Sequence, residues 1–300
     1  MITCMKSRPF IVACLLLTLT SLFWSGNFVL ARAMHAALPP MALSFGRWLI
    51  AFVLLAPFAL PRAWRDRRLL WKQRGRLLLL AALGVAGFNS LVYTGVQFTT
   101  ATNAVLLNSF IPILTVAFGA LFFRQGLHGR QVAGLMLSFA GVLLIISRGE
   151  WARLAGLDLN RGDLIVFVAM VFWAVYTLAI KEVDSRIDRL GLLGVLVGLG
   201  VLIIAPLYAW EHAGGRTFEL NVATLATFAY VGTLPSVAAY FFFNLGVGAI
   251  GPARAAMFIH LMPAFGALLS VAFLGEAFYL YHALGIAGIL AGVGLSTRGR

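Results

Sequence analysis

Ten long apolar segments limit the fold of this chain more than any other feature of its sequence. A helix that crosses the hydrocarbon core of a bilayer needs about 20 predominantly apolar residues. The segments meet that length with few charges, and Gly- and Pro-containing turns separate several of them. We therefore predict an all-α membrane protein with ten transmembrane helices. The predicted helices are 10–31, 41–60, 77–98, 101–123, 131–146, 164–180, 190–210, 222–247, 253–274 and 277–295.

The composition excludes an ordinary soluble protein. Of the 300 residues, 61% are hydrophobic and only 11% are charged, and the mean hydropathy is +0.95. A soluble domain carries about 25% charged residues. The net charge of +13 would indicate nucleic-acid binding only on a water-exposed fold, whereas the basic residues here lie between apolar runs. We expect the lipid bilayer and a small-molecule substrate as partners, and no nucleic acid.

The basic residues also predict the orientation of the chain. Lys and Arg concentrate in the cytoplasmic loops of membrane proteins. With the N-terminus inside, the inner loops carry 17 of the 23 basic residues, seven of them in 61–76, and the outer loops carry 5. We therefore expect both termini in the cytoplasm. No small-residue cleavage site follows the first apolar segment, so we expect a retained helix rather than a signal peptide.

The chain contains an internal repeat, whose matches keep their order along both halves. Phe23-Trp24 matches Phe172-Trp173, and Ala56-Pro57 matches Ala205-Pro206, at an offset of 149. At an offset of 151, the matching pairs are Gly95 and Gly246, Pro112 and Pro263, Gly134 and Gly285, and Gly141 and Gly292. The two halves, 10–147 and 162–296, each hold five helices. Because five is odd, the second half is inverted, which is typical of alternating-access transporters that bind substrate near the midplane.

Several motifs resemble the EamA domain, which occurs twice in exporters of the drug/metabolite transporter superfamily. In the first copy the motifs are 22–28 (LFWSGNF), Arg47, 99–107 leading to Pro112, and Gly134 with Gly141; in the second they are 252–263, 274–276 (LGE), and Gly285 with Gly292. The resemblance covers 10–295. It implies ten helices, cytoplasmic termini and export of amino acids or similar metabolites, most closely aromatic amino acids. The family often has Leu-Gly-Glu after the fourth helix, where this chain has Phe123-Arg124-Gln125.

No carboxylate occupies the middle of a predicted helix. All ten Asp and Glu residues lie in predicted loops or at helix ends. A proton-driven exporter of cations usually needs a buried carboxylate, which pairs with the cation and carries the proton. We therefore expect uniport of a neutral or zwitterionic substrate down its gradient. A proton-coupled antiporter, with His260 in the relay, is the alternative.

Arg47 is the clearest charge within a predicted helix. It lies about 10 Å into the second helix, and a charge at that depth is costly unless it is paired. No acid is near it in the sequence. A substrate carboxylate is one candidate partner. The alternative is a structural arginine that bonds backbone carbonyls or snorkels outward.

Polar and aromatic residues on matched helices predict a central cavity. Asn89 and Tyr93 share one face of the third helix, and Tyr240 and Asn244 share one face of the eighth. Amide and aromatic faces together can hold a planar, uncharged side chain. The predicted substrate-binding residues are Trp24, Asn27, Arg47, Asn89, Tyr93, Asn108, Trp173, Tyr176, Tyr240, Asn244 and His260, with Pro112 and Pro263 as helix-kink or gating residues. For each residue alone, packing, an interfacial aromatic belt or an interhelical hydrogen bond is the alternative.

Three classes of function compete at this stage. A metabolite exporter, most simply of aromatic or large neutral amino acids, accounts for the repeat and the polar faces. A drug or nucleotide-type metabolite transporter of the same fold is the alternative. A membrane-embedded enzyme would need convergent nucleophile, base or metal ligands, and we predict no catalytic residue, no metal and no cofactor. We expect a monomeric, multi-pass protein of the bacterial inner membrane.

Overall fold

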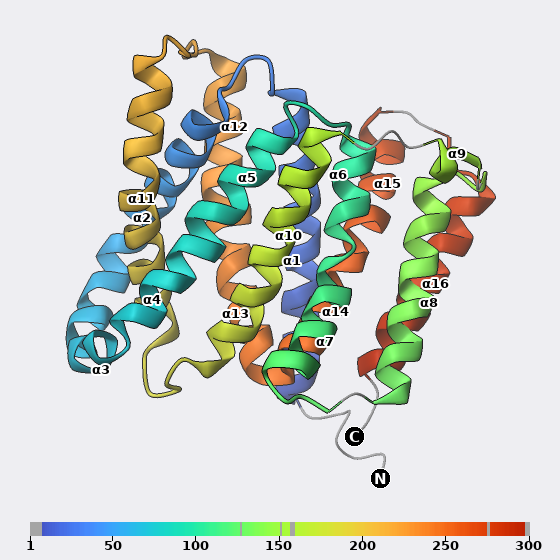
Figure 1. The fold of residues 1–300 in the computed structure, drawn as a ribbon, viewed down its shortest axis with the longest axis horizontal. Coiled ribbons are helices and arrows are strands. Elements are labelled where there is room, and N and C mark those ends of the chain that lie inside the picture. The colour runs from blue at the N-terminus through green and yellow to red at the C-terminus, as the bar shows by residue number, and fades with distance from the viewer. Residues whose placement is uncertain (1–7, 127, 151, 157–159, 275–276, 298–300) are drawn as a thin grey trace.

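The structure is a computed structural model that describes residues 8–126, 128–150, 152–156, 160–274 and 277–297. All regular elements in these residues are helices (Figure 1). In chain order they are α1 (Arg8–Ala33), α2 (Pro40–Arg65), α3 (Arg67–Lys72), α4 (Arg74–Leu80), η2 (Ala81–Gly87), α5 (Phe88–Gly95), α6 (Ala101–Asn108), α7 (Ile111–Phe122), α8 (Gly129–Ile146), α9 (Ala152–Ala155), α10 (Arg161–Ala179), η3 (Ile180–Glu182), α11 (Arg189–Ala213), α12 (Val222–Thr233), η4 (Leu234–Ala238), α13 (Ala239–Ile250), α14 (Pro252–Met257), η5 (Phe258–His260), α15 (Leu261–Leu274) and α16 (Leu280–Thr297).

Ten runs of the described helices are long and apolar enough to cross a membrane, which confirms the predicted all-α fold with ten spans. Five spans are single helices: α1, α2, α8, α11 and α16. The other five combine α4–η2–α5, α6–α7, α10–η3, α12–η4–α13 and α14–η5–α15. Most boundaries shift by a few residues, and two differences change the description of a segment. The basic segment 61–76 is largely helical because α2 runs to Arg65 and α3 follows, and the last helix begins at Leu280 rather than at 277.

The two halves pack around a pseudo-two-fold relation. Helix α1 of the first half contacts α13 and α15 of the second, and the equivalent helix α10 contacts α5 and α7 of the first. Equivalent helices also pair with each other, α2 with α11 and α8 with α16. A two-fold rotation that exchanges the halves swaps the two helices of each pair, so each pair must pack against itself as in an isologous interface. Because each half has five spans, the second half is inverted.

Four glycines show the same relation at atomic scale between α8 and α16. A Cβ on Gly134 would lie 2.5 Å from the Gly292 carbonyl oxygen, and one on Gly292 would lie 2.5 Å from the Gly134 carbonyl oxygen. Gly141 and Gly285 exclude each other's Cβ in the same way, at 2.6 and 2.8 Å. Gly134 matches Gly285 and Gly141 matches Gly292 in the repeat, so the pseudo-two-fold exchanges the two contacts. Only glycine permits this approach of two helices.

The helices that surround the centre of the molecule are interrupted at equivalent places. The π-helical segment η4 (234–238) coincides with the last five residues of η2 (83–87) at the offset of 151. The gap between α6 and α7 at 109–110 likewise corresponds to the end of η5 at 260. Interruptions of the i→i−4 ladder redirect the backbone and frequently occur at functional sites. They therefore point to the middle of spans three, four, eight and nine.

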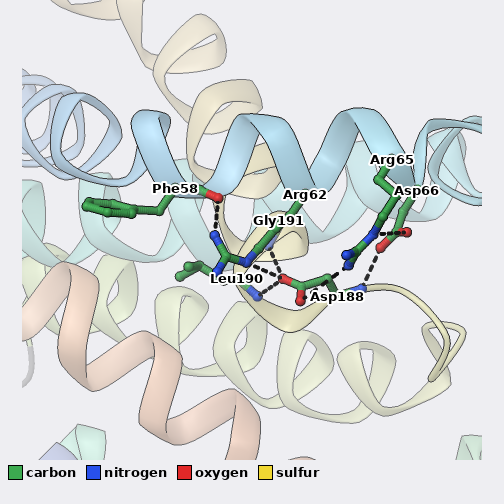
Figure 2. Close-up of polar contacts among 7 residues, drawn as sticks. All are labelled: Phe58, Arg62, Arg65, Asp66, Asp188, Leu190 and Gly191. Carbon is green, nitrogen blue, oxygen red and sulfur yellow. Dashed lines mark hydrogen bonds and ion pairs between the residues drawn. The ribbon is translucent and has the colours of Figure 1, made fainter.

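One face of the molecule carries the start of α1, the end of α16 and α3 (Figure 1), and we name it the terminal face. On this face Asp188 joins the two halves (Figure 2). It caps α11 by accepting from Gly191 N at 2.9 Å, and its own N–H donates to Asp66 Oδ2 at 2.8 Å. Arg62 and Arg65 of α2 lie 3.8 Å from its carboxylate. This cluster fixes the end of α2 against the start of α11.

Candidate functional site

Arg47 lies at the centre of a buried hydrogen-bond network. Its side chain is 0% exposed. Nε donates to Ser236 Oγ at 2.6 Å, and Nη1 lies 2.7 Å from Asn89 Oδ1, 2.6 Å from Tyr93 Oη and 3.2 Å from Asn27 Oδ1. These partners are neutral side chains, and no ion pair of Arg47 occurs in the described part of the chain. Arg47 thus does not snorkel, and its charge has no protein counter-ion there.

The interrupted helices supply backbone acceptors next to this network. Trp24 Nε1 donates to the Pro235 carbonyl at 3.0 Å, and Tyr240 Oη donates to the Gly84 carbonyl at 2.7 Å. Gly84 and Pro235 lie in η2 and η4 and are equivalent at the offset of 151. The two bonds therefore cross between the halves in opposite directions. Carbonyls released from the regular helix ladder are satisfied here by side chains of the other half.

An aromatic cluster borders the Arg47 network. The ring centroids of Trp24 and Trp173 are 5.0 Å apart, and Tyr240 lies 5.8 Å from Trp24 and 5.2 Å from Trp173. Phe88 lies 4.7 Å from Trp173. These distances are typical of edge-to-face and tilted pairs. Asn89 Nδ2 donates to Tyr240 Oη at 2.9 Å, which connects the aromatic cluster to the network.

The network and the cluster enclose a small central cavity. Its volume is about 10 Å³, which is room for about one water molecule. Two of its lining residues carry buried donors without a partner, Arg47 Nη2 and Trp173 Nε1. Since a buried donor without an acceptor is costly, both groups favour a ligand with acceptor oxygens. The lining residues are Trp24, Asn27, Phe28, Arg47, Phe88, Asn89, Asn108, Ile111, Trp173, Tyr240, Ile259 and Met262.

A larger cavity of about 490 Å³, which we name the vestibule, lies toward the face of the molecule opposite the terminal face. It extends from Ser25 and Phe28 of α1 to Arg32 near the end of that helix. Phe28 and Met262 line both the vestibule and the central cavity, so these two side chains separate them. Asn108 Nδ2 lies 3.3 Å from Met262 Sδ. The central cavity is thus closed, and the vestibule leads from the face opposite the terminal face as far as Phe28 and Met262.

The structure brings together most of the residues predicted to bind substrate. The predicted residues that line the central cavity are Trp24, Asn27, Arg47, Asn89, Asn108, Trp173 and Tyr240. Tyr93, Tyr176 and Asn244 lie behind that wall. Tyr93 donates to Asn27 Oδ1 at 2.8 Å, and Tyr176 donates to Asn244 Oδ1 at 3.0 Å. Pro263 lines the vestibule, and Pro112 is buried at the start of α7.

His260 lies in an interhelical contact outside both cavity linings. Its side chain is 0% exposed. Nε2 faces the Ser109 carbonyl oxygen at 2.9 Å, and Nδ1 lies 2.6 Å from Ser138 Oγ. Because a carbonyl only accepts, Nε2 carries the proton, and the Ser138 hydroxyl is the hydrogen-bond partner of the other ring nitrogen, Nδ1. His260 therefore joins η5 to the break between α6 and α7 and to α8.

Several cavity residues had no distinguishing signal in the sequence. They are Phe28, Phe88, Ile111, Ile259 and Met262. Apolar residues are equally common in packing and on lipid-facing surfaces, so a single sequence cannot separate these roles. Ser236, which accepts from Arg47, was also missed. Its position beside Pro235, which interrupts the eighth span, was the available signal.

The described carboxylates lie away from the central cavity. Asp163 lies in the first turn of α10, where it accepts from Asn103 Nδ2 at 3.2 Å, and Glu211 in the last turn of α11 accepts from the Ala42 N–H at 2.9 Å. Both side chains are buried at helix ends near the face opposite the termini. Within the described residues, then, no carboxylate occupies the middle of a span. Glu276 lies outside those residues.

Ten spans in two inverted halves, with a closed polar and aromatic site between them, define a multi-pass membrane protein of the transporter class. The profile of the EamA-like transporter family matches residues 11–147 and 160–298. The chain belongs to this family, and both halves of the fold are copies of its repeat.

Similar proteins carry the same general description. An uncharacterized transporter of Archaeoglobus fulgidus is 30% identical over 94% of this chain and 96% of its own length. The probable terminal-alkyne amino-acid exporter of Streptantibioticus cattleyicolor is 26% identical, over 91% of each chain. A solved crystal structure superposes with a TM-score of 0.75 at 22% identity, covering 94% of this chain and 95% of that chain. The last likeness concerns the fold alone.

Proposed function

We propose that this transporter exports amino acids with large apolar or aromatic side chains by alternating access. The observation that carries the proposal is the pair of buried donors without partners, Arg47 Nη2 and Trp173 Nε1, at a cavity lined by aromatic rings. A ligand that satisfies both donors has an anionic or strongly polar acceptor next to an apolar body. The description of one relative as a probable amino-acid exporter supports the same substrate class.

The carboxylate of an amino acid matches the chemistry of Arg47. Guanidinium and carboxylate form charge-assisted hydrogen bonds, which are about twice as strong as neutral ones. Such a pair would neutralise a buried charge whose described protein partners are all neutral. Trp173 Nε1 would donate to the second carboxylate oxygen. Asn108 carries an amide oxygen at the same cavity and would accept from the substrate ammonium group.

The aromatic walls select the side chain of the substrate. Trp24, Phe88 and Tyr240 line the cavity together with Phe28, and aromatic faces bind planar apolar groups by stacking and edge contacts. A closed volume of about 10 Å³ does not hold an amino acid, so the helices must separate to admit one. Phe28 and Met262 stand between this site and the vestibule and are the side chains that must move.

Transport in this account is uniport down the substrate gradient in the bacterial inner membrane. A coupled proton would need a titratable carboxylate or histidine at the cavity, and the residues that line it include neither, since His260 lies outside the lining. The excess of basic residues on the terminal face supports a cytoplasmic position of that face. The vestibule then opens to the outside, and export releases substrate through it. Cysteines placed at Arg74 and Gly215 should then react with impermeant reagents from opposite sides.

A binding panel tests the substrate class. We would measure the thermal stability of the purified protein in detergent with phenylalanine, its decarboxylated amine, a nucleoside monophosphate and a lipophilic cation. The proposal expects a stabilising shift with phenylalanine and none with the amine, because only the acid contacts Arg47. A shift with the nucleotide alone, or with the cation alone, would favour a metabolite or drug transporter instead.

A further inference from the structure

A groove on the terminal face is separate from the central site and the vestibule. It has a volume of about 1040 Å³ and lies between α2, α3, α4 and α11. Figure 1 shows α3 joining the lower ends of α2 and α4. The walls are leucine-rich, including Leu60, Leu77, Leu78 and Leu199. Leu199 lies ten residues after the start of α11, about 15 Å along the helix, so the groove runs from the membrane surface into the hydrocarbon layer.

Two tryptophan–arginine pairs stand at the surface end of this groove. The Arg67 guanidinium lies 4.9 Å from the centre of the Trp64 ring, and that of Arg74 lies 5.2 Å from the centre of the Trp71 ring. Each arginine also donates to the carbonyl of the same tryptophan, at 3.0 and 3.2 Å. The pairs repeat seven residues apart with the same spacing. Both rings are about 70% exposed, Trp64 at 71% and Trp71 at 70%.

Unlike Arg62 and Arg65, these two arginines have no carboxylate partner among the described residues. Arg62 and Arg65 face Asp188, whereas the described residues place no acid within ion-pair distance of Arg67 or Arg74. Stacking and the carbonyl bond hold each guanidinium in place while leaving donors free, because a guanidinium has five. Tryptophan at a bilayer surface lies at the level of the lipid headgroups. These arginines are therefore positioned for a phosphate rather than for a protein anion.

We propose that this groove binds one anionic phospholipid of the leaflet next to the terminal face. An acyl chain lies along Leu77, Leu78 and Leu199, and the phosphate is bound by Arg67 and Arg74. Charge complementarity selects an anionic headgroup over a zwitterionic one, because segment 61–76 holds seven basic residues and one acid. That acid, Asp66, already accepts from Asp188 N and faces Arg65. The lipid would stabilise the joint between α2 and α4 that α3 forms.

Native mass spectrometry with two lipids of identical acyl chains tests this site. We expect purified protein to retain one phosphatidylglycerol and much less phosphatidylcholine. Each arginine that binds the phosphate directly should contribute about fivefold, so Arg67→Gln with Arg74→Gln should lower phosphatidylglycerol retention about 25-fold. Leu78→Trp, which fills the groove without changing its charge, should lower it as well. Leu78 is 52% exposed, so this variant should fold.

A charge-matched control separates a site from a diffuse surface field. Arg68→Gln with Lys72→Gln removes two positive charges from the same segment, outside the groove lining. The proposal expects this control to keep its bound phosphatidylglycerol. Equal loss in the control and in the Arg67/Arg74 variant, or equal retention of both lipids by the wild-type chain, would overturn it. The proposal would also be overturned if a second copy of the chain covered the groove in a dimer and no lipid were released when that dimer dissociated.

Discussion

Replacing Arg47 by glutamine should separate recognition of the substrate carboxylate from the rest of the site. The glutamine removes the charge and the Nη2 donor but leaves a polar side chain. The former partners keep bonds of their own, Tyr93 to Asn27 at 2.8 Å and Asn89 to Tyr240 at 2.9 Å. We therefore expect the variant to fold and to reach the membrane in normal amounts.

The expected magnitude follows from the bond that is lost. A hydrogen bond to a charged group contributes about 1.5–3 kcal/mol, and 1.4 kcal/mol is a tenfold change in affinity. Arg47→Gln should thus raise the KM for a large neutral amino acid about 10- to 150-fold. The amide of the same amino acid has no carboxylate, so its transport should change little. Wild-type protein should prefer the acid, and the variant should lose that preference.

The assay is uptake of both labelled compounds into proteoliposomes. Arg161→Gln is the matched control, because Arg161 lies outside the linings of the central cavity and the vestibule, and it should retain the preference for the acid. Equal weakening of acid and amide transport would mean that Arg47 supports the fold rather than the carboxylate. Unchanged transport of both would refute the placement of the substrate at this residue.

Three further perturbations test other parts of the structure. Phe28→Ala should open the wall between the vestibule and the central cavity. In a chain without its native cysteines, a cysteine at Ile111 (1% exposed) should therefore react with a small thiol reagent only when Phe28 is replaced by alanine. Reaction with Phe28 present as well as absent would contradict the closed cavity. Gly134→Ala should lower the melting temperature because the new Cβ meets the opposite backbone at 2.5 Å, whereas Gly294→Ala, with nothing within 4 Å, should not. Asp188→Ala should cost about 1 kcal/mol as a lost helix cap and Asp188→Asn much less; equal losses in thermal unfolding would assign the effect to the ion pairs instead.

The spans and their pairing into two halves were predictable because the signals are local. Apolar length defines a span within one segment, and the odd number of spans in each half dictates inversion. The interruptions were only partly predictable. Pro235 marks η4, but no proline marks η2, which corresponds to η4 at the offset of 151. The helical course of 61–76 was hidden because a charged surface helix and a charged loop have similar composition.

The contacts of the site were beyond a single sequence for a different reason. Arg47 and Ser236 are 189 residues apart, and nothing in either segment indicates that they meet. The sequence left open whether Arg47 binds backbone carbonyls, snorkels outward or binds a substrate carboxylate. The structure gives a fourth arrangement, in which neutral side chains hold part of the guanidinium and leave Nη2 without a partner. For His260 the sequence offered cavity lining or an interhelical bond, and the structure shows the bond to Ser109.

The most direct test of the proposed function is the steady-state distribution of labelled phenylalanine across proteoliposomes that contain only this protein. Uniport predicts that internal and external concentrations become equal, and that an imposed pH gradient changes neither the final ratio nor its approach. The rate should fall in Arg47→Gln. Accumulation above the external concentration that requires the pH gradient would contradict uniport, and absence of any phenylalanine movement would contradict the proposed substrate class.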